Sequence, residues 1–385
     1  MIQPENNNNS VGLVRDYDFV FGNNDDDALP LDCGKKLKHV TIRYEVYGTL
    51  NENCDNAILV EHALTGDAHL AGYHTLRDKK PGWWDTMVGP GKTFDTNRYF
   101  IVCSNIIGGC SGSTGPRSIN PDTGKPYNMD FPVITIGDMV RAQKRLMEHL
   151  KIHKWLAVVG GSMGGMLALQ WAIAYPESVN SIVAIATTSR VSPQSIAFNW
   201  VGREAIMGDP TWQNGNYEKQ PVRGLAIARM LAHITYLSDE SMHEKFGRHL
   251  QDSQNYSFEF DKDFQIESYL EYQGTRFVER FDADSYLYIT RAIDYFDISD
   301  IADGDLHKTF ARVNMPFLVV SFSSDWLFPA YQSQELVKAL LKNGIDTTYC
   351  NIESSYGHDA FLLETETLGN LITSFLTNRY LEVKA

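Results

Sequence analysis

Residues 156–170 read LAVVGGSMGGMLALQ, and this stretch decides the fold class. Within it, Gly160-Gly161-Ser162-Met163-Gly164 has the pattern G-x-S-x-G. The apolar run Trp155–Val159 that precedes the pattern is typical of a strand buried on both faces. The run Met163–Tyr175 that follows it is rich in helix-forming residues until Pro176 ends it. This order of strand, tight turn and helix predicts a nucleophile elbow, which strains the serine backbone and turns its oxygen toward solvent.

Context is needed because the pattern itself is common. With glycine and serine at average abundance, G-x-S-x-G arises by chance in roughly one chain in ten of this length. The alternative interpretation is an ordinary glycine-rich turn, and the flanking strand and helix signals favour the elbow over it.

Bulk composition bounds the class of protein. A chain of 385 residues that is 43% hydrophobic can bury a large core, as one large domain with an insertion or as two domains. Its formal net charge of -14 disfavours a nucleic acid or an anionic membrane as the main partner. The N-terminus has neither a basic start nor an apolar stretch, and no run of 18 apolar residues occurs, so we expect a soluble cytoplasmic protein.

Five cysteines are scattered without C-x-x-C spacing, so no disulfide framework is expected: Cys33, Cys54, Cys103, Cys110 and Cys350. His62, His69 and His74 crowd one stretch, but neither H-E-x-x-H nor a cysteine and histidine spacing suited to zinc is present. The sequence therefore predicts no metal site.

Strand and helix signals alternate along most of the chain. We expect a flexible arm over residues 1–30, which are rich in Asn and Asp, and a folded core over 31–186 and 315–385. Strands are expected at Thr41–Tyr47, Ala57–Glu61, Tyr99–Ser104, Trp155–Val159, Ser181–Ala186, Phe317–Ser321 and Thr347–Asn351. A helix is expected at Asp138–Leu150. The alternation predicts the α/β class, with a mostly parallel central sheet and helices on both faces.

Strand signals vanish over residues 187–314, where helical stretches such as Arg223–Leu237 and Ser285–Phe296 replace them. A helical insertion at this point of the chain would lie over the carboxyl edge of the sheet, where ligands of α/β proteins bind. We interpret it as a lid. A subdomain that only stabilises the fold is the alternative.

A serine hydroxyl needs a neutral imidazole and a carboxylate to attack a carbonyl group. Asp325 follows one predicted strand and precedes a helix, and His358 follows the last predicted strand. Ser162, Asp325 and His358 stand in the chain order of α/β-hydrolases. Taken singly, Asp325 has the alternative of a helix cap and His358 that of a solvated loop residue. Their shared position at strand-to-helix junctions favours a catalytic triad.

The negative oxygen that develops during acyl transfer needs two hydrogen-bond donors. One is expected to be the backbone N–H of Met163, the residue after the nucleophile. The second is expected from the segment His62–Gly66, which leaves an early strand, with Leu64 as the donor. A simple strand-ending turn is the alternative for this segment.

Several motifs together resemble the homoserine O-acetyltransferases, acyl-CoA-dependent members of the α/β-hydrolase superfamily in methionine biosynthesis. The likeness runs from about residue 35 to the C-terminus. It is carried by His62–Gly66, Gly108–Cys110, Gly112–Pro116, Gly160–Gly165, Ala228-Arg229, Ile234–Tyr236, Asp325–Pro329 and Gly357–Asp359. The resemblance implies the fold with a helical lid and a triad of Ser162, Asp325 and His358.

The resemblance also implies the substrates and the residues that bind them. Arg229 would pair with the carboxylate of L-homoserine and Asp359 with its ammonium group, with Tyr236 assisting; these charges suit a zwitterion. Arg203 is a competing candidate for the carboxylate, and an exposed helical arginine is the alternative for Arg229.

By the same resemblance, acetyl-CoA is the co-substrate, no cofactor is bound permanently, and the protein forms a homodimer through the helical insertion. The implied mechanism is double displacement through an acylated Ser162. A homoserine O-succinyltransferase on the same scaffold is the nearest alternative, and serine as acceptor is a further one. A serine esterase or lipase, or a binding protein without catalysis, are alternatives from other classes.

Overall fold

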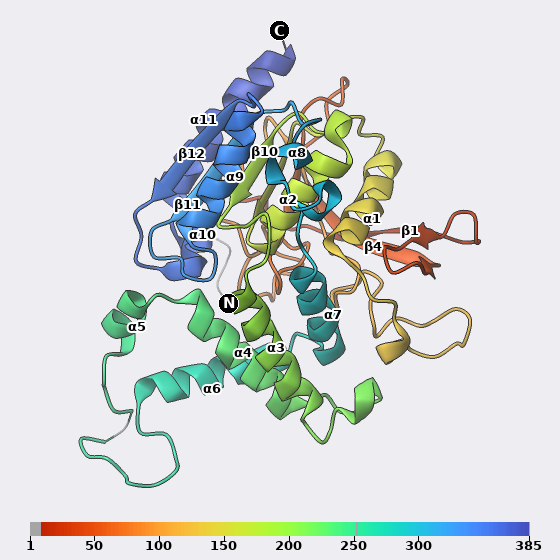
Figure 1. Cartoon of the computed structure of the whole chain (residues 1–385). Coiled ribbons are helices and arrows are strands. Elements are labelled where there is room, and N and C mark those ends of the chain that lie inside the picture. Colours follow the sequence, from red (N-terminus) through yellow and green to blue (C-terminus); the bar gives the residue numbers. More distant parts are fainter. Residues whose placement is uncertain (1–8, 252, 385) are drawn as a thin grey trace.

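A computed structural model gives the fold and describes residues 9–251 and 253–384. Its centre is an eight-stranded sheet (Figure 1). Six strands are parallel to their neighbours, in the spatial order β8, β5, β9, β10, β11 and β12. At one edge, β4 pairs antiparallel with β8, and β1 pairs antiparallel with β4. The spatial order is β1 (Asp16–Phe21), β4 (Val40–Tyr47), β8 (Phe100–Ser104), β5 (Ala57–Glu61), β9 (Ala157–Gly161), β10 (Ile182–Ile185), β11 (Phe317–Phe322) and β12 (Thr347–Ile352).

Both faces of the sheet carry hydrophobic cores, because successive strand residues point to opposite faces. In β10, Ile182 and Ala184 join one core and Val183 and Ile185 join the other. The first core is completed by α1 (Ile136–His149), α2 (Met163–Ala174) and α9 (Ala330–Lys342). The second is completed by α10 (Ala360–Leu363) and α11 (Thr365–Lys384). The mostly parallel sheet with helices on both faces, as the sequence predicts, is confirmed.

Element boundaries differ from the predicted ones by a few residues, and local chemistry explains one case. Helix α1 begins at Ile136, two residues before the predicted start. Thr135 accepts a hydrogen bond from the backbone N–H of Asp138, and the Asp138 carboxylate accepts one from the N–H of Thr135. This capping box fixes the start of the helix. Likewise β9 extends to Gly161, up to the elbow itself.

The N-terminal segment differs from the flexible arm predicted for residues 1–30. Asp16–Phe21 forms β1, which pairs antiparallel with β4 over six residues. Tyr17 and Phe19 pack against the first core, and Asp18 accepts two hydrogen bonds from Arg43 of β4, at 2.9 and 2.8 Å. The segment Asp16–Phe21 therefore has an alternating strand pattern, but polar runs on both sides make the pattern hard to recognise in the sequence. Residues 1–8 of the predicted arm lie outside the described residues.

Two small sheets of two strands each lie apart from the central sheet. They pair β2 (Leu29–Pro30) with β3 (Lys36–Leu37), and β6 (Val88–Gly89) with β7 (Phe94–Asp95).

The described residues between β10 and β11 form helices joined by loops and contribute no strand to the central sheet. In Figure 1 most of these helices gather below the sheet and its flanking helices. Helix α4 packs against both α3 and α6, and α3 also contacts α7. No helix of the described residues is long and apolar enough to cross a bilayer. The helices are α3 (Pro193–Met207), α4 (Val222–Tyr236), α5 (Asp239–Phe246), α6 (Gln265–Val278), α7 (Ala283–Asp294) and α8 (Leu306–Thr309).

Candidate active site

Ser162 lies on a strained turn between β9 and α2, at the end of one of the inner strands of the sheet. Its backbone has φ 58° and ψ −124°, a region that residues with a side chain rarely adopt. A Cβ atom on Gly160 would lie 2.2 Å from the carbonyl of Gly164, and one on Gly164 would lie 2.3 Å from the carbonyl oxygen of Glu61. Only glycine fits at these two positions, because the backbones of β9, α2 and β5 approach one another closely there. The glycines of the predicted elbow thus make its tight turn possible.

Hydrogen bonds join the three residues that the sequence predicts as a triad. Asp325 lies on the loop after β11, and His358 lies in a single 3₁₀ turn, Gly357–Asp359, after β12. The Nε2 atom of His358 is 2.8 Å from Oγ of Ser162, and its Nδ1 atom is 2.8 Å from Oδ2 of Asp325. All three side chains are buried, with Ser162 the most accessible at 9%. The arrangement can take a proton from the serine and stabilise the resulting imidazolium.

Asp325 is held by its own loop. Its Oδ1 atom accepts hydrogen bonds from the backbone N–H groups of Leu327 and Phe328, both at 3.0 Å. Helix α9 begins at Ala330, after Pro329, so these bonds fix the loop rather than cap the helix. The second carboxylate oxygen is thereby aimed at His358.

The imidazole of His358 sits between aromatic rings and a carboxylate. Burial by itself would lower the pKa of His358, but the charge and hydrogen bond of Asp325 outweigh burial and raise this pKa above its ordinary value of 6.5. The ring centroids of Phe328, Phe361 and Tyr236 lie 5.3, 5.6 and 5.9 Å from that of His358. The imidazole is therefore fixed in orientation, and it is more basic than a free histidine.

The two backbone donors predicted for the oxyanion lie beside the serine. Met163 is the first residue of α2, so its N–H has no acceptor within the helix. Leu64 lines the same pocket as Ser162 and Met163. A turn closed by the hydrogen bond from Gly66 N–H to the carbonyl oxygen of Ala63 shapes the segment that carries Leu64.

The predicted substrate-binding residues gather around the same site. Arg229 of α4 donates a hydrogen bond to Oγ1 of Thr65 at 3.3 Å, and its guanidinium carbon lies 5.6 Å from the Tyr236 ring centroid. Burial raises the pKa of Asp359, while the charges of His358 and Arg229 oppose this rise. The charge of Arg229 thus acts on Asp359, the neighbour of His358, although no ion pair joins the two side chains.

Arg203 is placed differently. Its guanidinium forms a 2.5 Å ion pair with Asp294, and both side chains are almost fully buried. It does not line the pocket at Ser162, although Asn199, one helical turn earlier in α3, does. Its charge is already compensated, so Arg229 is better placed than Arg203 to bind a carboxylate.

Arg280 is a candidate residue that sequence reasoning missed. It lies between α6 and α7, and its Nη1 atom donates to the carbonyl oxygen of Thr65 at 3.0 Å. Arg280 stays exposed to solvent, but partial desolvation and the neighbouring charge of Arg229 lower the pKa of its guanidinium. No carboxylate of the described residues lies within 4.0 Å of either guanidinium. Two guanidiniums that both bond to Thr65 and make no ion pair within the described residues indicate a binding position for an anion.

The pocket above Ser162 is mostly apolar, and helices of the insertion supply much of its wall. Its lining includes Phe198 and Asn199 of α3, Ala232 of α4 and Tyr286 of α7. Ser162 thus faces the helices that follow β10 rather than open solvent.

Comparison with known proteins places these features in a family. Residues 56–365 match the model of the α/β-hydrolase fold family. The chain is 58% identical over 356 residues to a homoserine O-acetyltransferase of Methanohalobium evestigatum, covering 92% of this chain and 72% of the relative. It is 55% identical over 371 residues to the enzyme of that name from Solidesulfovibrio magneticus, covering 95% and 93%.

Solved structures agree with these relatives. The crystal structure of homoserine O-acetyltransferase from Bacillus anthracis superimposes with a TM-score of 0.88 at 30% identity, covering 94% of this chain and 98% of the other. Esterase E22 has a TM-score of 0.86 at 31% identity, covering 94% and 100%. With more than half of its residues identical to proteins of one name over most of its length, the chain belongs to the homoserine O-acetyltransferase family of the α/β-hydrolase fold.

Proposed function

We propose that the protein transfers an acetyl group from acetyl-CoA to the side-chain hydroxyl of L-homoserine, giving O-acetyl-L-homoserine and CoA through an acetyl ester on Ser162. The observation that carries the proposal is the unbroken hydrogen-bond chain from Ser162 through His358 to Asp325, beside two uncompensated arginines. Acetyl-CoA acts as a co-substrate, and the chemistry requires no permanently bound cofactor.

In the first half-reaction, Nε2 of His358 takes the proton of Ser162 while Oγ attacks the thioester carbonyl. The tetrahedral oxyanion accepts hydrogen bonds from the N–H groups of Met163 and Leu64. When it collapses, the carbon–sulfur bond breaks and the imidazolium gives its proton to the sulfur. CoA leaves as a free thiol, and the acetyl group stays on Ser162.

In the second half-reaction, homoserine occupies the pocket with its carboxylate at Arg229 and Arg280 and its ammonium group at Asp359, with Tyr236 beside them. Nε2 of His358 takes the proton of the homoserine hydroxyl, and the oxygen attacks the acetyl carbon. Collapse of this second intermediate returns the proton to Ser162 and releases O-acetylhomoserine. The charged grip brings the acceptor oxygen close to the ester and raises its effective concentration.

Water competes with homoserine for the acetyl group, and the helical insertion at 187–314 acts as a lid against it. Apolar side chains of α3, α4 and α7 line the pocket and limit the entry of water. A serine esterase is the second candidate function, because esterase E22 is 31% identical over almost the whole chain. The paired guanidiniums favour a charged acceptor over water.

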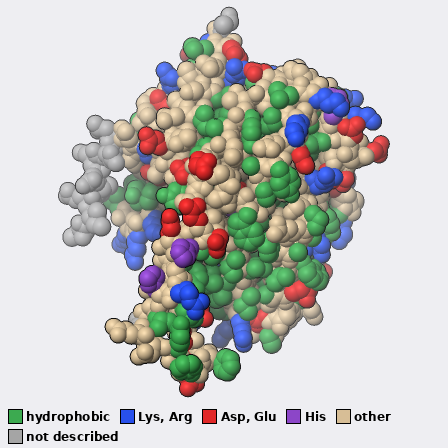
Figure 2. Space-filling view, turned by 60° about the vertical axis from the view of Figure 1, so that its left-hand side comes forward, with side chains coloured by type: hydrophobic (Ala, Val, Ile, Leu, Met, Phe, Trp, Pro, Cys, Tyr) green, Lys and Arg blue, Asp and Glu red, His purple; other side chains and the backbone are tan. Residues whose placement is uncertain are grey.

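The insertion also provides a surface for a homodimer. Its helices α3 and α4 expose large hydrophobic side chains: Trp200, Val201, Val222, Ile227 and Ile234. Figure 2 shows hydrophobic side chains gathered on the lower half of one face of the molecule. Monomeric proteins rarely leave large apolar patches in water, so we propose that a second copy covers these helices.

A matrix of donors and acceptors tests the function. Acetyl-CoA and succinyl-CoA are each offered with homoserine, serine or water, and the release of free thiol is measured. We expect acetyl-CoA with homoserine to give the highest kcat/KM, with O-acetylhomoserine as product. Faster turnover with succinyl-CoA would replace the donor in the proposal, and equal thiol release with and without homoserine would make the protein a hydrolase.

A further inference from the structure

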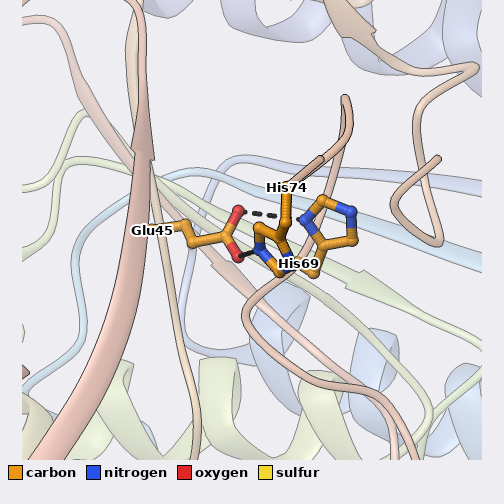
Figure 3. Close-up of side chains that lie close together, drawn as sticks. All are labelled: Glu45, His69 and His74. Carbon is orange, nitrogen blue, oxygen red and sulfur yellow. Dashed lines mark hydrogen bonds and ion pairs between the residues drawn. The ribbon is translucent and has the colours of Figure 1, made fainter. Parts of the chain in front are cut away.

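Glu45, His69 and His74 form a cluster of side chains separate from the triad. Glu45 lies in β4, whereas both histidines lie in the segment between β5 and β6. In Figure 3 the carboxylate of Glu45 faces a nitrogen of each imidazole ring. Its Oε1 atom is 2.6 Å from Nε2 of His74, and its Oε2 atom is 3.2 Å from Nδ1 of His69. One ligand-type atom from each residue lies within 4.8 Å of the other two.

The carboxylate of this cluster is buried. Glu45 is only 1% exposed. A buried carboxylate needs a cation or several hydrogen-bond donors to offset its lost hydration, and its polar contacts here are His69, His74 and Tyr47.

A further shell of hydrogen bonds orients the carboxylate. The hydroxyl of Tyr47 donates to Oε2 of Glu45 at 2.6 Å and accepts from the backbone N–H groups of Leu70 and Ala71, at 2.8 and 3.2 Å. Such outer partners typically fix the carboxylate ligands of metal ions. His74 is partly exposed, with 44% of its side chain accessible, so solvent can reach the cluster.

We propose that Glu45, His69 and His74 bind a divalent transition-metal ion of the zinc class, with water in the fourth position. Two imidazoles and one carboxylate are a ligand set that zinc favours. Zinc bonds of about 2.0 to 2.2 Å place tetrahedral ligand atoms roughly 3.4 Å apart, so small movements of the present contacts admit an ion.

Metal binding also fixes the balance of protons. Each coordinating nitrogen must be unprotonated, so the proton that now lies between it and the carboxylate moves to the other ring nitrogen or to solvent. No redox change or covalent step is involved. The ion would tie β4 to the segment after β5, the same segment that carries Leu64, and its role is therefore structural support rather than catalysis.

Isothermal titration with zinc chloride tests the site. The full-length protein, without a histidine tag and freed of metal by a chelator, is titrated alongside His74→Gln and His153→Gln. Glutamine at 74 keeps a hydrogen-bond donor toward Glu45 but is a poor zinc ligand. His153 is exposed and lies outside the cluster, so it controls for binding at surface histidines. We expect one ion per wild-type chain, at least tenfold weaker binding by His74→Gln and unchanged binding by His153→Gln.

Cobalt(II) gives a second readout that does not depend on acyl transfer. Tetrahedral coordination by wild-type protein should produce strong visible absorption that Glu45→Gln and His74→Gln lose. Absence of saturable zinc binding by the wild type, or equal affinity in wild type and His74→Gln, would overturn the metal site and leave the cluster as a hydrogen-bonded ion pair. Because acyl transfer is measured separately, failure here leaves the proposed function unaffected.

Discussion

In the proposed mechanism, His358 accepts the proton of Ser162 only while its imidazole is neutral, so the reaction would depend on the pKa of this one side chain. Asp325 raises that pKa, which means that the imidazolium forms at a higher pH than for a free histidine. The kcat/KM for acetyl-CoA should therefore fall as the pH decreases through an apparent pKa above 6.5. A rate that stays constant from about pH 6 to 8 would contradict this role of His358.

Replacing Asp325 with asparagine keeps the shape of the side chain and removes its charge. The asparagine amide would favour the wrong imidazole tautomer, so we expect kcat to fall about 10³- to 10⁴-fold with little change in folding. Steady-state kinetics and circular dichroism measure the two effects. Asp346→Asn, at an exposed carboxylate paired with Arg379, is the matched control and should retain wild-type turnover. Normal activity of Asp325→Asn would remove Asp325 from the mechanism.

A variant at Arg280 distinguishes the binding of homoserine from the formation of the acyl-enzyme. Losing one charge-assisted contact to a carboxylate should raise the KM for homoserine about 10- to 100-fold in Arg280→Gln. The burst of thiol with acetyl-CoA alone should be unchanged, because homoserine is absent from that step. Arg276→Gln, an exposed site in α6 paired with Glu279, is the control. If Arg280→Gln reduces the thiol burst by the same factor by which it raises the KM for homoserine, Arg280 instead holds the segment His62–Gly66 in place through Thr65.

The triad could be predicted from the sequence because each member stands in a short motif at a strand-to-helix junction. Its hydrogen bonds then follow from the topology, which brings the carboxyl ends of β9, β11 and β12 to one edge. Arg280 has no such signal, because it lies between α6 and α7 and reaches the site only through its contact with Thr65, a residue far away in the sequence.

At the level of secondary structure, a buried network ties β5 to the helices behind the elbow. The Oε2 atom of Glu61 accepts a hydrogen bond from Gln143 of α1 at 2.7 Å, and Gln143 accepts one from Trp171 of α2 at 3.0 Å. Burial raises the pKa of Glu61 to about 8, although the Gln143 and Trp171 contacts oppose the rise. Glu61 is therefore protonated in the folded protein at neutral pH.

This raised pKa makes folding stability depend on pH. The folded state binds a proton that the unfolded state releases above its ordinary pKa of 4.5, so the contribution of Glu61 decreases as pH rises from about 4.5 to about 8. The slope is at most about 1.4 kcal/mol per pH unit. Denaturant unfolding at several pH values should show this loss in the wild type and less of it in Glu61→Gln. Identical slopes for both proteins would show that Glu61 is ionised in the folded state.

Most elements of the central sheet could be predicted from periodicity, but their ends and strand β1 could not. The start of α1 depends on a Thr135 capping box, which the apolar pattern alone does not reveal. Strand β1 is flanked by polar runs, and its stability comes from pairing with β4 and from the Arg43 contact to Asp18. Such contacts between distant segments carry little local signal.

At the level of the whole molecule, the apolar face of α3 and α4 predicts a dimer. Trp200 and Val222 are 48% and 55% exposed in the single chain. Sedimentation analysis should find a dimer for the wild type and a monomer for Trp200→Glu, because a buried unpaired carboxylate opposes association. Leu341→Glu, at an exposed position of α9, should remain dimeric. A monomeric wild type, or a dimeric Trp200→Glu, would contradict this interface.

Contacts between distant residues that stand in no recognisable motif are the part of the site that sequence reasoning does not reach. Two such sets join residues from different elements. Arg229 and Arg280 both bond to Thr65. Glu45 bonds to His69 and His74. Motif spacing along the chain led to the prediction of no metal site, because zinc motifs record only ligands that are close in sequence. The proposed metal site depends on a ligand from β4 that no local pattern associates with the two histidines.

The most direct test of the proposed mechanism is mass spectrometry of the protein after incubation with acetyl-CoA alone, with free thiol measured in parallel. The mechanism predicts one acetyl group on Ser162 and a burst of about one equivalent of thiol per site. Ser162→Ala should fold normally and give neither. If thiol is released only when homoserine is present and no acetyl group is found on Ser162, the acetyl group passes directly between the two substrates and Ser162 is not acylated.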